Sequence, residues 1–138
     1  MINKRRQYQA LLSIAREAKQ NAYVPYSKFH VGVAVLCSNG KIFTGCNIEN
    51  SSYGLTLCAE RVAIFKAVSE GIHSFKAIAI VSDNPNFTPP CGACRQVLLD
   101  LAGDIDFIMG NKKGEMKIIK LSSLLPHAFT HNDLARKK

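Results

Sequence analysis

The fold is decided by the stretch Val31-Gly32-Val33-Ala34-Val35-Leu36-Cys37-Ser38-Asn39-Gly40. Its first seven residues are almost all apolar, which predicts a strand that is buried on both faces of a sheet. Asn39-Gly40 is a favoured pair for a tight turn, so residues 41–48 are expected to return as an antiparallel partner strand. The sheet therefore begins with a hairpin whose first strand lies in the interior.

Helical and strand-like segments alternate on either side of this hairpin. Apolar residues recur at helical spacing between Tyr8 and Ala18, which predicts a first helix from Asn3 to about residue 21. Further helices are expected at residues 58–70, with Thr56 as the cap, and at residues 91–101. Further strands are expected at residues 75–81, 105–109 and 116–119. This order predicts an α/β fold with one mixed sheet and helices on both of its faces.

Length and composition are those of an ordinary globular chain. The 138 residues are 47% hydrophobic and 20% charged, which predicts a single domain over residues 1–138. No stretch approaches the ~20 apolar residues that cross a bilayer, and the basic start lacks the apolar core of a signal peptide. Five cysteines is an odd number, which favours free thiols in a reducing compartment over disulfides. We therefore expect a cytoplasmic protein with no membrane partner.

The net charge of +8 raises the question of nucleic acid. Six of the eighteen basic residues lie at the chain ends: Lys4, Arg5, Arg6, Arg136, Lys137 and Lys138. Removing those six leaves twelve basic residues against ten acidic ones, so the body of the chain is nearly balanced. This pattern favours solvated basic tails over a dedicated nucleic-acid surface, where basic residues cluster.

Two short motifs carry candidate chemistry: Cys58-Ala59-Glu60 and Pro90-Cys91-Gly92-Ala93-Cys94. Three thiolates can hold a zinc ion and leave its fourth tetrahedral position open to water, which distinguishes a catalytic zinc site from a structural one. Zinc lowers the pKa of bound water toward ~7, and Glu60 is then a candidate proton carrier. A lone Cys-x-x-Cys is a weak signal, but its combination with Cys-Ala-Glu is specific. We expect one zinc ion per chain.

The spacing of these residues also predicts where the metal lies. Cys58 and Cys91 are each expected to open a helix, where the positive end of the helix dipole favours a thiolate. Cys91 and Cys94 can reach one point because they are three residues apart. Cys58 and Glu60 differ by about 200° around a helix. They converge only if the metal lies beyond the helix end, so the pattern predicts a zinc ion held between two helix N-termini.

Five other residues each allow two interpretations. Arg61 either donates hydrogen bonds to the ligand sulfurs, offsetting their negative charge, or is an ordinary surface residue of a helix. Asn47 and Glu49, two apart in a strand, point the same way and suit sugar hydroxyls, or they are simply solvated. Cys37 and Cys46 lie in apolar strands and are expected to pack rather than bind metal.

The motifs closely resemble those of the zinc-dependent cytidine deaminases of the small, free-nucleoside type. The resemblance covers nearly the whole chain and is carried by Cys58-Ala59-Glu60-Arg61, Pro89-Pro90-Cys91-Gly92-Ala93-Cys94-Arg95-Gln96, and residues 26–32, 47–54 and 124–129. The departures are His30, which stands where proline is common in the family, and the basic chain ends.

This resemblance implies a three-layer α/β/α domain, a homotetramer with active sites built at subunit contacts, and Cys58, Cys91 and Cys94 as the zinc ligands. It implies hydrolysis of cytidine or 2′-deoxycytidine to the uracil nucleoside and ammonia, with Glu60 carrying the protons. Arg61 then tunes the charge of the sulfurs.

The resemblance also implies how substrate is held. Phe29 stacks on the pyrimidine, and the backbone N–H of Ala59 binds the base carbonyl. Asn47 and Glu49 bind the ribose 3′-hydroxyl. Phe129 places an aromatic ring near the site of a neighbouring subunit.

Three alternatives remain open from the sequence. Two keep the same fold: a deaminase of an aminonucleoside antibiotic, and a deaminase of cytosine or adenine in polynucleotides, to which the +8 charge gives slight support. The third is a zinc-stabilised nucleic-acid-binding module without catalysis. It requires a fourth protein ligand, for which Cys37 and Cys46 are the only plausible donors.

Overall fold

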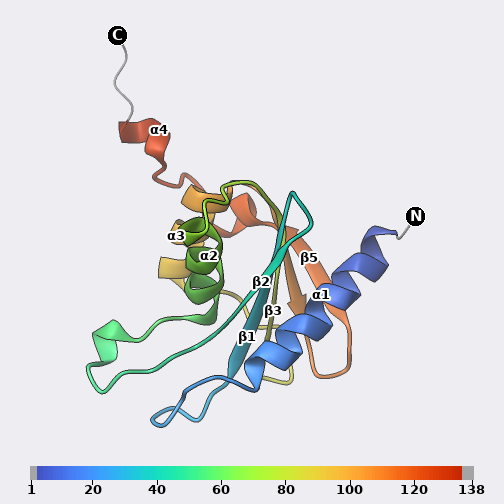
Figure 1. The fold of residues 1–138 in the computed structure, drawn as a ribbon, viewed down its shortest axis with the longest axis vertical. Coiled ribbons are helices and arrows are strands. Elements are labelled where there is room, and N and C mark those ends of the chain that lie inside the picture. The colour runs from blue at the N-terminus through green and yellow to red at the C-terminus, as the bar shows by residue number, and fades with distance from the viewer. Residues whose placement is uncertain (1–2, 135–138) are drawn as a thin grey trace.

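The apolar run that starts at Val31 forms β1 (Val31–Cys37), an interior strand of a five-stranded sheet with the order β2-β1-β3-β4-β5. A computed structural model describes residues 3–134 of the chain (Figure 1). The other elements are α1 (Lys4–Lys19), β2 (Ile42–Cys46), η1 (Tyr53–Leu55), α2 (Ala59–Ser69), β3 (Phe75–Ser82), α3 (Gly92–Ala102), β4 (Asp106–Gly110), β5 (Met116–Lys120), η2 (Leu121–Leu124) and α4 (His131–Leu134). Only β3 and β4 run parallel among the described strand pairs. The predicted mixed sheet, which starts with a hairpin, is confirmed.

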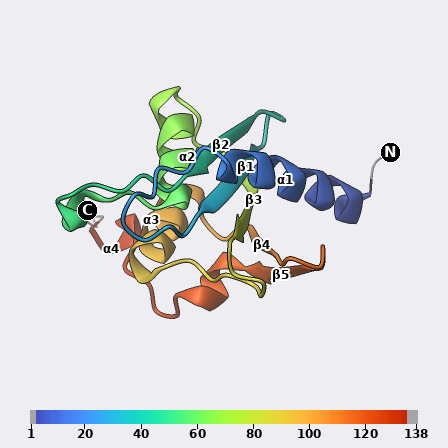
Figure 2. The same cartoon turned by 90° about the horizontal axis from the view of Figure 1, so that it is seen from below.

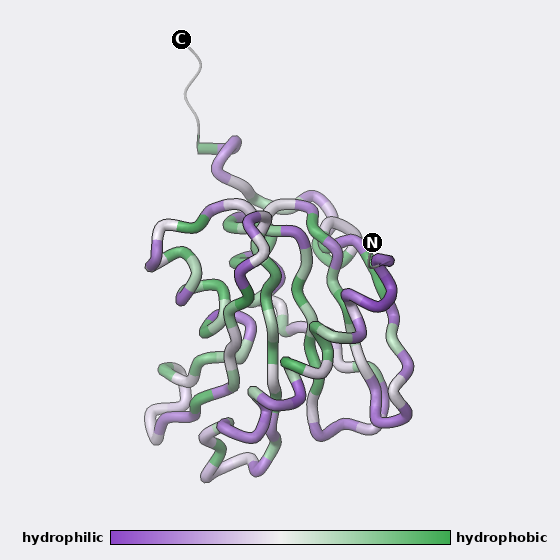
Figure 3. Tube along the Cα trace, turned by 45° about the vertical axis from the view of Figure 1, so that its right-hand side comes forward, coloured by the Kyte–Doolittle hydropathy of each residue, from purple (hydrophilic) through white to green (hydrophobic). Residues whose placement is uncertain are grey.

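The interior strands β1, β3 and β4 are buried on both faces, as their apolar sequences predict. Helix α1 covers one face, and α2 and α3 cover the other (Figures 1 and 2). Successive residues of β1 serve different cores, since Val33 and Val35 pack with α2 and α3 whereas Ala34 and Leu36 pack with α1. Hydrophobic residues follow the strands, whereas the first turn of α1 and the strand-connecting turns are hydrophilic (Figure 3). The expected three-layer α/β/α arrangement is confirmed.

Two glycines set how closely the helices approach the sheet. A Cβ atom on Gly32 of β1 would lie 2.1 Å from the carbonyl oxygen of Ala15 in α1. A Cβ atom on Gly45 of β2 would lie 2.3 Å from the carbonyl oxygen of Ala59, the first residue of α2. Any larger residue would push these backbones apart. The start of α2, next to Cys58, is therefore held directly against the sheet.

Several predicted boundaries need correction. Helix α1 ends at Lys19 rather than near residue 21, and β2 ends at Cys46 rather than at residue 48. The cap of α2 is Cys58 rather than Thr56, whose hydroxyl instead accepts the backbone N–H of Asn50 at 3.1 Å. The remaining predicted helices and strands differ from the observed ones by at most one residue at either end. Such differences are expected, because periodicity does not fix the terminal residues of an element.

Of the two basic ends of the chain, the structure describes the N-terminal one, whose residues are exposed and belong to the predicted first helix. Lys4, Arg5 and Arg6 form the first turn of α1, and Lys4 Nζ lies 3.0 Å from the buried carboxylate of Asp106. Arg136, Lys137 and Lys138 lie outside the described residues. Across residues 3–134, no helix is both long enough and apolar enough to span a bilayer.

Candidate active site

Three thiols meet at the starts of α2 and α3. The Sγ atoms of Cys58, Cys91 and Cys94 all lie within 4.8 Å of one another. Cys91 Sγ is 3.6 Å from Cys58 Sγ and 3.3 Å from Cys94 Sγ. Cys58 is the N-cap of α2 and Cys91 is the N-cap of α3, so each stands just outside its helix. The structure therefore brings the three predicted ligands together between two helix N-termini.

The chemistry and the spacing of these donors fit a zinc ion. Thiolates around tetrahedral zinc at ~2.3 Å lie about 3.8 Å from one another, close to the two measured separations. No other cysteine, histidine or acidic residue among those described joins the cluster. Cys37 is fully buried in the core, and Cys46 lies at the end of β2. The arrangement thus offers three protein ligands, as an open catalytic site requires.

Cys58 and Cys94 differ in how readily their thiols lose a proton. A hydrogen bond from Cys94 and a second from Arg61 lower the pKa of Cys58 to about 5, although burial opposes them. The hydrogen bond with Cys58, together with burial, raises the pKa of Cys94. A thiolate at Cys58 is therefore favoured even before a metal binds, which suits a ligand that must be deprotonated.

Glu60 is buried beside the thiols. Its side chain is only 3% exposed, and it lines the same cavity as Cys58 and Cys91. Burial raises the pKa of Glu60 to about 7, and the charge of Cys58 adds to this effect. Because Cys58 caps α2 from outside the helix, Glu60 in the first turn faces the cavity beyond the helix end. A carboxyl group with a pKa near neutrality suits general acid–base chemistry.

Arg61 contacts a sulfur. Its Nη2 donates to Cys58 Sγ at 3.5 Å, and its Nε is buried without a hydrogen-bond partner in the described part of the chain. The same hydrogen bond raises the pKa of Arg61. Of the two interpretations offered by the sequence, the geometry is that of an arginine directed at a thiol, and not that of a free surface residue.

Cys58, Glu60 and Cys91 line a cavity of about 300 Å³ at the end of the sheet where β1 begins and β3 ends. Its walls include Phe29, Asn47, Glu49 and Ala59, which the family resemblance assigns to substrate. Ala59 is the first residue of α2, a position whose N–H has no acceptor within the helix. The sequence did not single out Val31, Leu57, Ile80 or Thr88, which complete the walls. They come from separate elements, and only the folded sheet brings them together.

Asn47 holds the segment that carries Phe29. Its Oδ1 accepts the backbone N–H of Val31 at 2.9 Å, and its Nδ2 donates to the carbonyl oxygen of Phe29 at 2.8 Å. The sequence predicts Asn47 within a strand, but the residue directly follows the end of β2. The side chain is therefore a support for the cavity wall as well as a polar group facing the cavity.

Glu49 supports the same segment. Its carboxylate accepts the backbone N–H groups of Tyr26 and Ser27 at 3.0 and 3.1 Å, and also the hydroxyl of Ser27. The hydrogen bond from the Ser27 side chain lowers the pKa of Glu49. Glu49 is therefore kept ionised, and its remaining lone pairs can accept hydroxyl groups of a ligand.

Phe129 does not reach this cavity. Its side chain is 56% exposed, and its carbonyl oxygen accepts a hydrogen bond from Gln96 Nε2 at 2.5 Å. The residue lies in the segment between η2 and α4. Its assignment to the site of a neighbouring subunit stays a prediction.

Three thiols, a buried carboxyl group and two helix N-termini at the edge of a mixed sheet define the class of zinc-binding deaminase sites. Residues 5–109 match the family model described as the cytidine and deoxycytidylate deaminase zinc-binding region. The chain is 51% identical over 127 residues to a cytidine deaminase of Halalkalibacterium halodurans, covering 91% of this chain and 96% of that protein. It is 49% identical over 126 residues to that of Sporosarcina psychrophila, covering 91% and 93%.

The fold gives the same result. A crystal structure of cytidine deaminase from Burkholderia pseudomallei matches with a TM-score of 0.86 and 43% identity, covering 88% of this chain and 98% of that chain. The chain belongs to the cytidine deaminase family.

Proposed function

We propose that this protein hydrolyses free cytidine and 2′-deoxycytidine to uridine and 2′-deoxyuridine, releasing ammonia. The observation that carries the proposal is a buried carboxyl group, Glu60, beside three thiols in a cavity of about 300 Å³. The named relatives are cytidine deaminases, and the family match includes both motifs of the site.

Cys58, Cys91 and Cys94 would hold one zinc ion per chain. The bound ion supplies Lewis-acid activation of a water molecule at neutral pH. Three thiolates bring more negative charge than the ion neutralises, which weakens this activation. Arg61 offsets part of that charge through its hydrogen bond to Cys58 Sγ at 3.5 Å. It acts through the sulfur and touches no substrate, so it is a positioning residue.

Glu60 carries the protons of the reaction. Water adds to C4 of the base and loses a proton to the Glu60 carboxylate, which delivers it to N3. The second water proton passes through Glu60 to the departing amino group, which leaves as ammonia. The C4–N bond breaks, a C4 carbonyl forms, and Glu60 returns to its starting state. A pKa of about 7 lets one carboxyl group both accept and donate at neutral pH.

The remaining walls orient the nucleoside. Phe29 stacks on the ring, and the N–H of Ala59 binds the base carbonyl. Asn47 and Glu49 bind the ribose 3′-hydroxyl, with the Glu49 carboxylate as its acceptor. A polynucleotide has this hydroxyl esterified at nearly every residue, and the negative charge of Glu49 would repel a nearby phosphate. These contacts favour a free nucleoside over a nucleotide or a strand.

An ultraviolet assay of cytidine loss with zinc-loaded protein tests the proposal, with Glu60→Gln as the matched inactive control. The substrates are cytidine, 2′-deoxycytidine, cytidine monophosphate, cytosine, a cytosine-containing single strand and an aminonucleoside antibiotic. Rapid loss of the two nucleosides and slow loss of the rest are expected. Efficient turnover of the strand or the antibiotic, with little activity on cytidine, would favour the corresponding alternative. Inactive protein with four sulfurs on its zinc would favour the structural module.

We propose further that the chain is one domain and forms a homotetramer, with Phe129 reaching a neighbouring site. Large exposed apolar side chains support this assembly: Tyr53, Leu55, Phe65, Phe129 and Leu134. Light scattering during gel filtration measures the mass. Phe129→Ala should raise the KM for cytidine in the tetramer.

We place the enzyme in the cytoplasm, because all five of its cysteines are free.

A further inference from the structure

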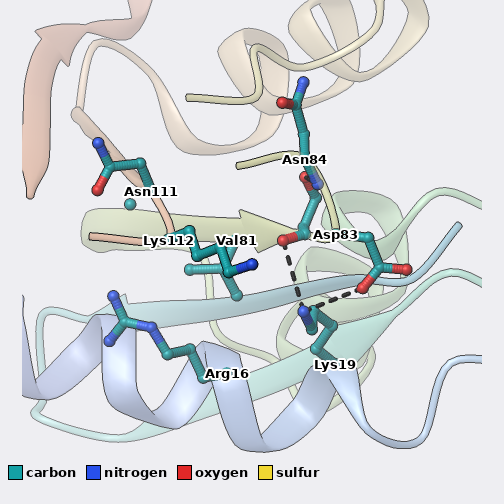
Figure 4. Close-up of a pocket in the computed structure, with 9 residues that line it drawn as sticks. Arg16, Lys19, Val81, Asp83, Asn84, Asn111 and Lys112 are labelled. Atoms are coloured by element: carbon teal, nitrogen blue, oxygen red, sulfur yellow. Dashed lines mark hydrogen bonds and ion pairs between the residues drawn. The ribbon is translucent and has the colours of Figure 1, made fainter. Parts of the chain in front are cut away.

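A second cavity, of about 390 Å³, lies on the opposite face of the sheet from the thiol cavity. It is bounded by the last turns of α1 and by the residues that follow β3 and β4 (Figure 4). These two strands are the parallel pair of the sheet. Crevices outside the carboxyl ends of parallel strands are a common place for ligands in α/β folds. The hollow shares no lining residue with the thiol cavity.

The lining of this cavity, which we call the basic cavity, is mainly cationic. Arg16 and Lys19 come from one face of α1, three residues apart, and Lys112 comes from the turn after β4. Asp83 is the acidic residue among the lining groups. Three cationic groups and one acidic group leave a formal charge of +2 in the lining.

Asp83 is already neutralised within the fold. Lys19 Nζ lies 3.0 Å from its Oδ1, and the backbone N–H and ring Nδ1 of His30 lie 2.8 and 2.6 Å from its Oδ2. Partial burial raises the pKa of Asp83, but the hydrogen bonds from His30 and Lys19 outweigh it and lower the pKa to about 2. Because Asp83 is paired with Lys19 and His30, Arg16 and Lys112 have no acidic partner among the lining residues of the cavity.

Those cations have unused donors. Arg16 Nη2 is buried and has no hydrogen-bond partner among residues 3–134. In the same described range, no acidic residue forms an ion pair with Lys112. Asn84, whose Oδ1 accepts the N–H of Asn86 at 3.0 Å, adds an amide at the cavity wall. A buried guanidinium nitrogen without a partner is unfavourable, and an anion with several acceptor oxygens relieves it.

We propose that the basic cavity binds a dianion of the phosphate class, supplied as free phosphate or as the phosphate group of a nucleotide. Arg16 contributes a planar guanidinium, whose forked donors suit phosphate oxygens, and Lys112 contributes a mobile point charge. The site is separate from deamination and does not depend on the proposed function.

Calorimetric titration of the full-length, zinc-loaded protein at fixed chloride concentration tests this site. Inorganic phosphate is the probe, with adenosine monophosphate and adenosine as the arms that distinguish the sources. We expect phosphate to bind in the millimolar range or tighter and adenosine to give no signal from this site. Tighter binding of adenosine monophosphate than of phosphate identifies a nucleotide, and equal binding identifies free phosphate.

Arg16→Gln and Lys112→Gln should each weaken phosphate binding by about tenfold or more, because each removes a charge-assisted contact. Arg5→Gln removes the same charge from an exposed position of α1 outside the cavity and should leave binding unchanged. Lys112 is exposed, so its variant keeps the test decisive if Arg16→Gln destabilises the fold. Absence of phosphate binding to the wild type, or equal loss in Arg5→Gln and Lys112→Gln, overturns the proposal.

Discussion

The two cavities at one end of the sheet have opposite chemistry. In the thiol cavity, burial raises the pKa of Glu60 to about 7. In the basic cavity, His30 and Lys19 overcome partial burial and lower the pKa of Asp83 to about 2. Both carboxyl groups lie near the same end of β3, on different sides of the sheet. Burial favours the protonated form of Glu60, whereas the hydrogen bonds from His30 and Lys19 favour the ionised form of Asp83.

The helix ends favour the thiolates of one cavity and the cations of the other. The thiol cavity lies at the N-termini of α2 and α3, whose partial positive charge stabilises thiolates. The basic cavity lies at the C-terminus of α1, where Arg16 and Lys19 occupy the last turns. Cations are favoured there for the same reason. Each cavity has thus acquired side chains of the sign that its helix ends stabilise.

Removing one of the three thiols should cause the largest change in activity and stability, and it tests the thiol cavity. Cys58→Ala, Cys91→Ala and Cys94→Ala are each expected to lose zinc and deaminase activity, and to lower the melting temperature, because the ion stabilises the folded state. Plasma mass spectrometry gives the zinc content, and a cytidine assay gives the activity. Cys37→Ala and Cys46→Ala are the controls and should keep one zinc ion per chain. A full equivalent of zinc in Cys94→Ala contradicts this ligand set.

Glu60→Gln should separate proton transfer from metal binding. The amide preserves the shape of the side chain but cannot carry a proton, so kcat is expected to fall by about 10²–10⁴-fold or more. Zinc content should match the wild type, since Glu60 is not a ligand. Near-normal turnover in a zinc-loaded variant would remove Glu60 from the mechanism.

Arg61 tests whether charge balance sets the activity of the thiol cavity. Arg61→Ala removes the hydrogen bond to Cys58 Sγ and should lower activity or zinc affinity by about 10–100-fold. Arg61→Lys keeps the charge without the forked donors, so partial recovery is expected. Zinc competition with a chelator measures affinity, and kcat measures activation. Wild-type behaviour of both variants would mean that the contact to sulfur has no functional weight.

Asn47 and Glu49 test the wall of the thiol cavity, with an expected rise of about tenfold in the KM for cytidine. Asn47→Ala also removes two hydrogen bonds to the segment between Phe29 and Val31, and should lower the melting temperature. Glu49→Gln should change KM with a smaller thermal effect, because the amide oxygen still accepts hydrogen bonds. Unchanged KM values in both variants would show that these residues only support the segment.

The smallest expected effect is on the stability of the fold at acid pH, and it comes from Asp83 of the basic cavity. Because the pKa of Asp83 is lower in the folded chain than its usual 3.8, its ionised form stabilises the fold above about pH 4. That contribution declines as the pH falls from about 4 to about 2. Denaturant titrations across this range should show a shallower loss of stability in Asp83→Asn than in the wild type. An identical pH dependence would mean that His30 and Lys19 stabilise the ionised form of Asp83 no better than water does.

The sequence predicted the thiol cavity better than the basic cavity for a physical reason. Cys91 and Cys94 lie on one turn, and the caps of two helices meet wherever those helices start at one edge of a sheet. Glu60 follows Cys58 by two residues, a spacing that predicts convergence only if the metal lies beyond the helix end. Such short-range relations can be read from residue spacing alone.

The basic cavity has no such local signal. Arg16, Asp83 and Lys112 come from three distant segments, and only the pairing of β3 with β4 and the packing of α1 bring them together. The supporting roles of Asn47 and Glu49 were also missed. They depend on the path of the segment before β1, which no periodic pattern describes. The fold class, in contrast, rests on apolar strands and turns that are local in sequence.

The order of the zinc ligands along the chain has a consequence for how the protein is made. Cys58 and Cys91 are separated by 33 residues, which include all of β3. At the usual synthesis rates of about 5–20 residues per second, Cys58 waits roughly 2 to 7 seconds for its partner thiols to be added. During that interval Cys58 lacks the two other thiols of the predicted zinc site. Zinc binding by all three thiols is therefore possible only late in the synthesis of this chain.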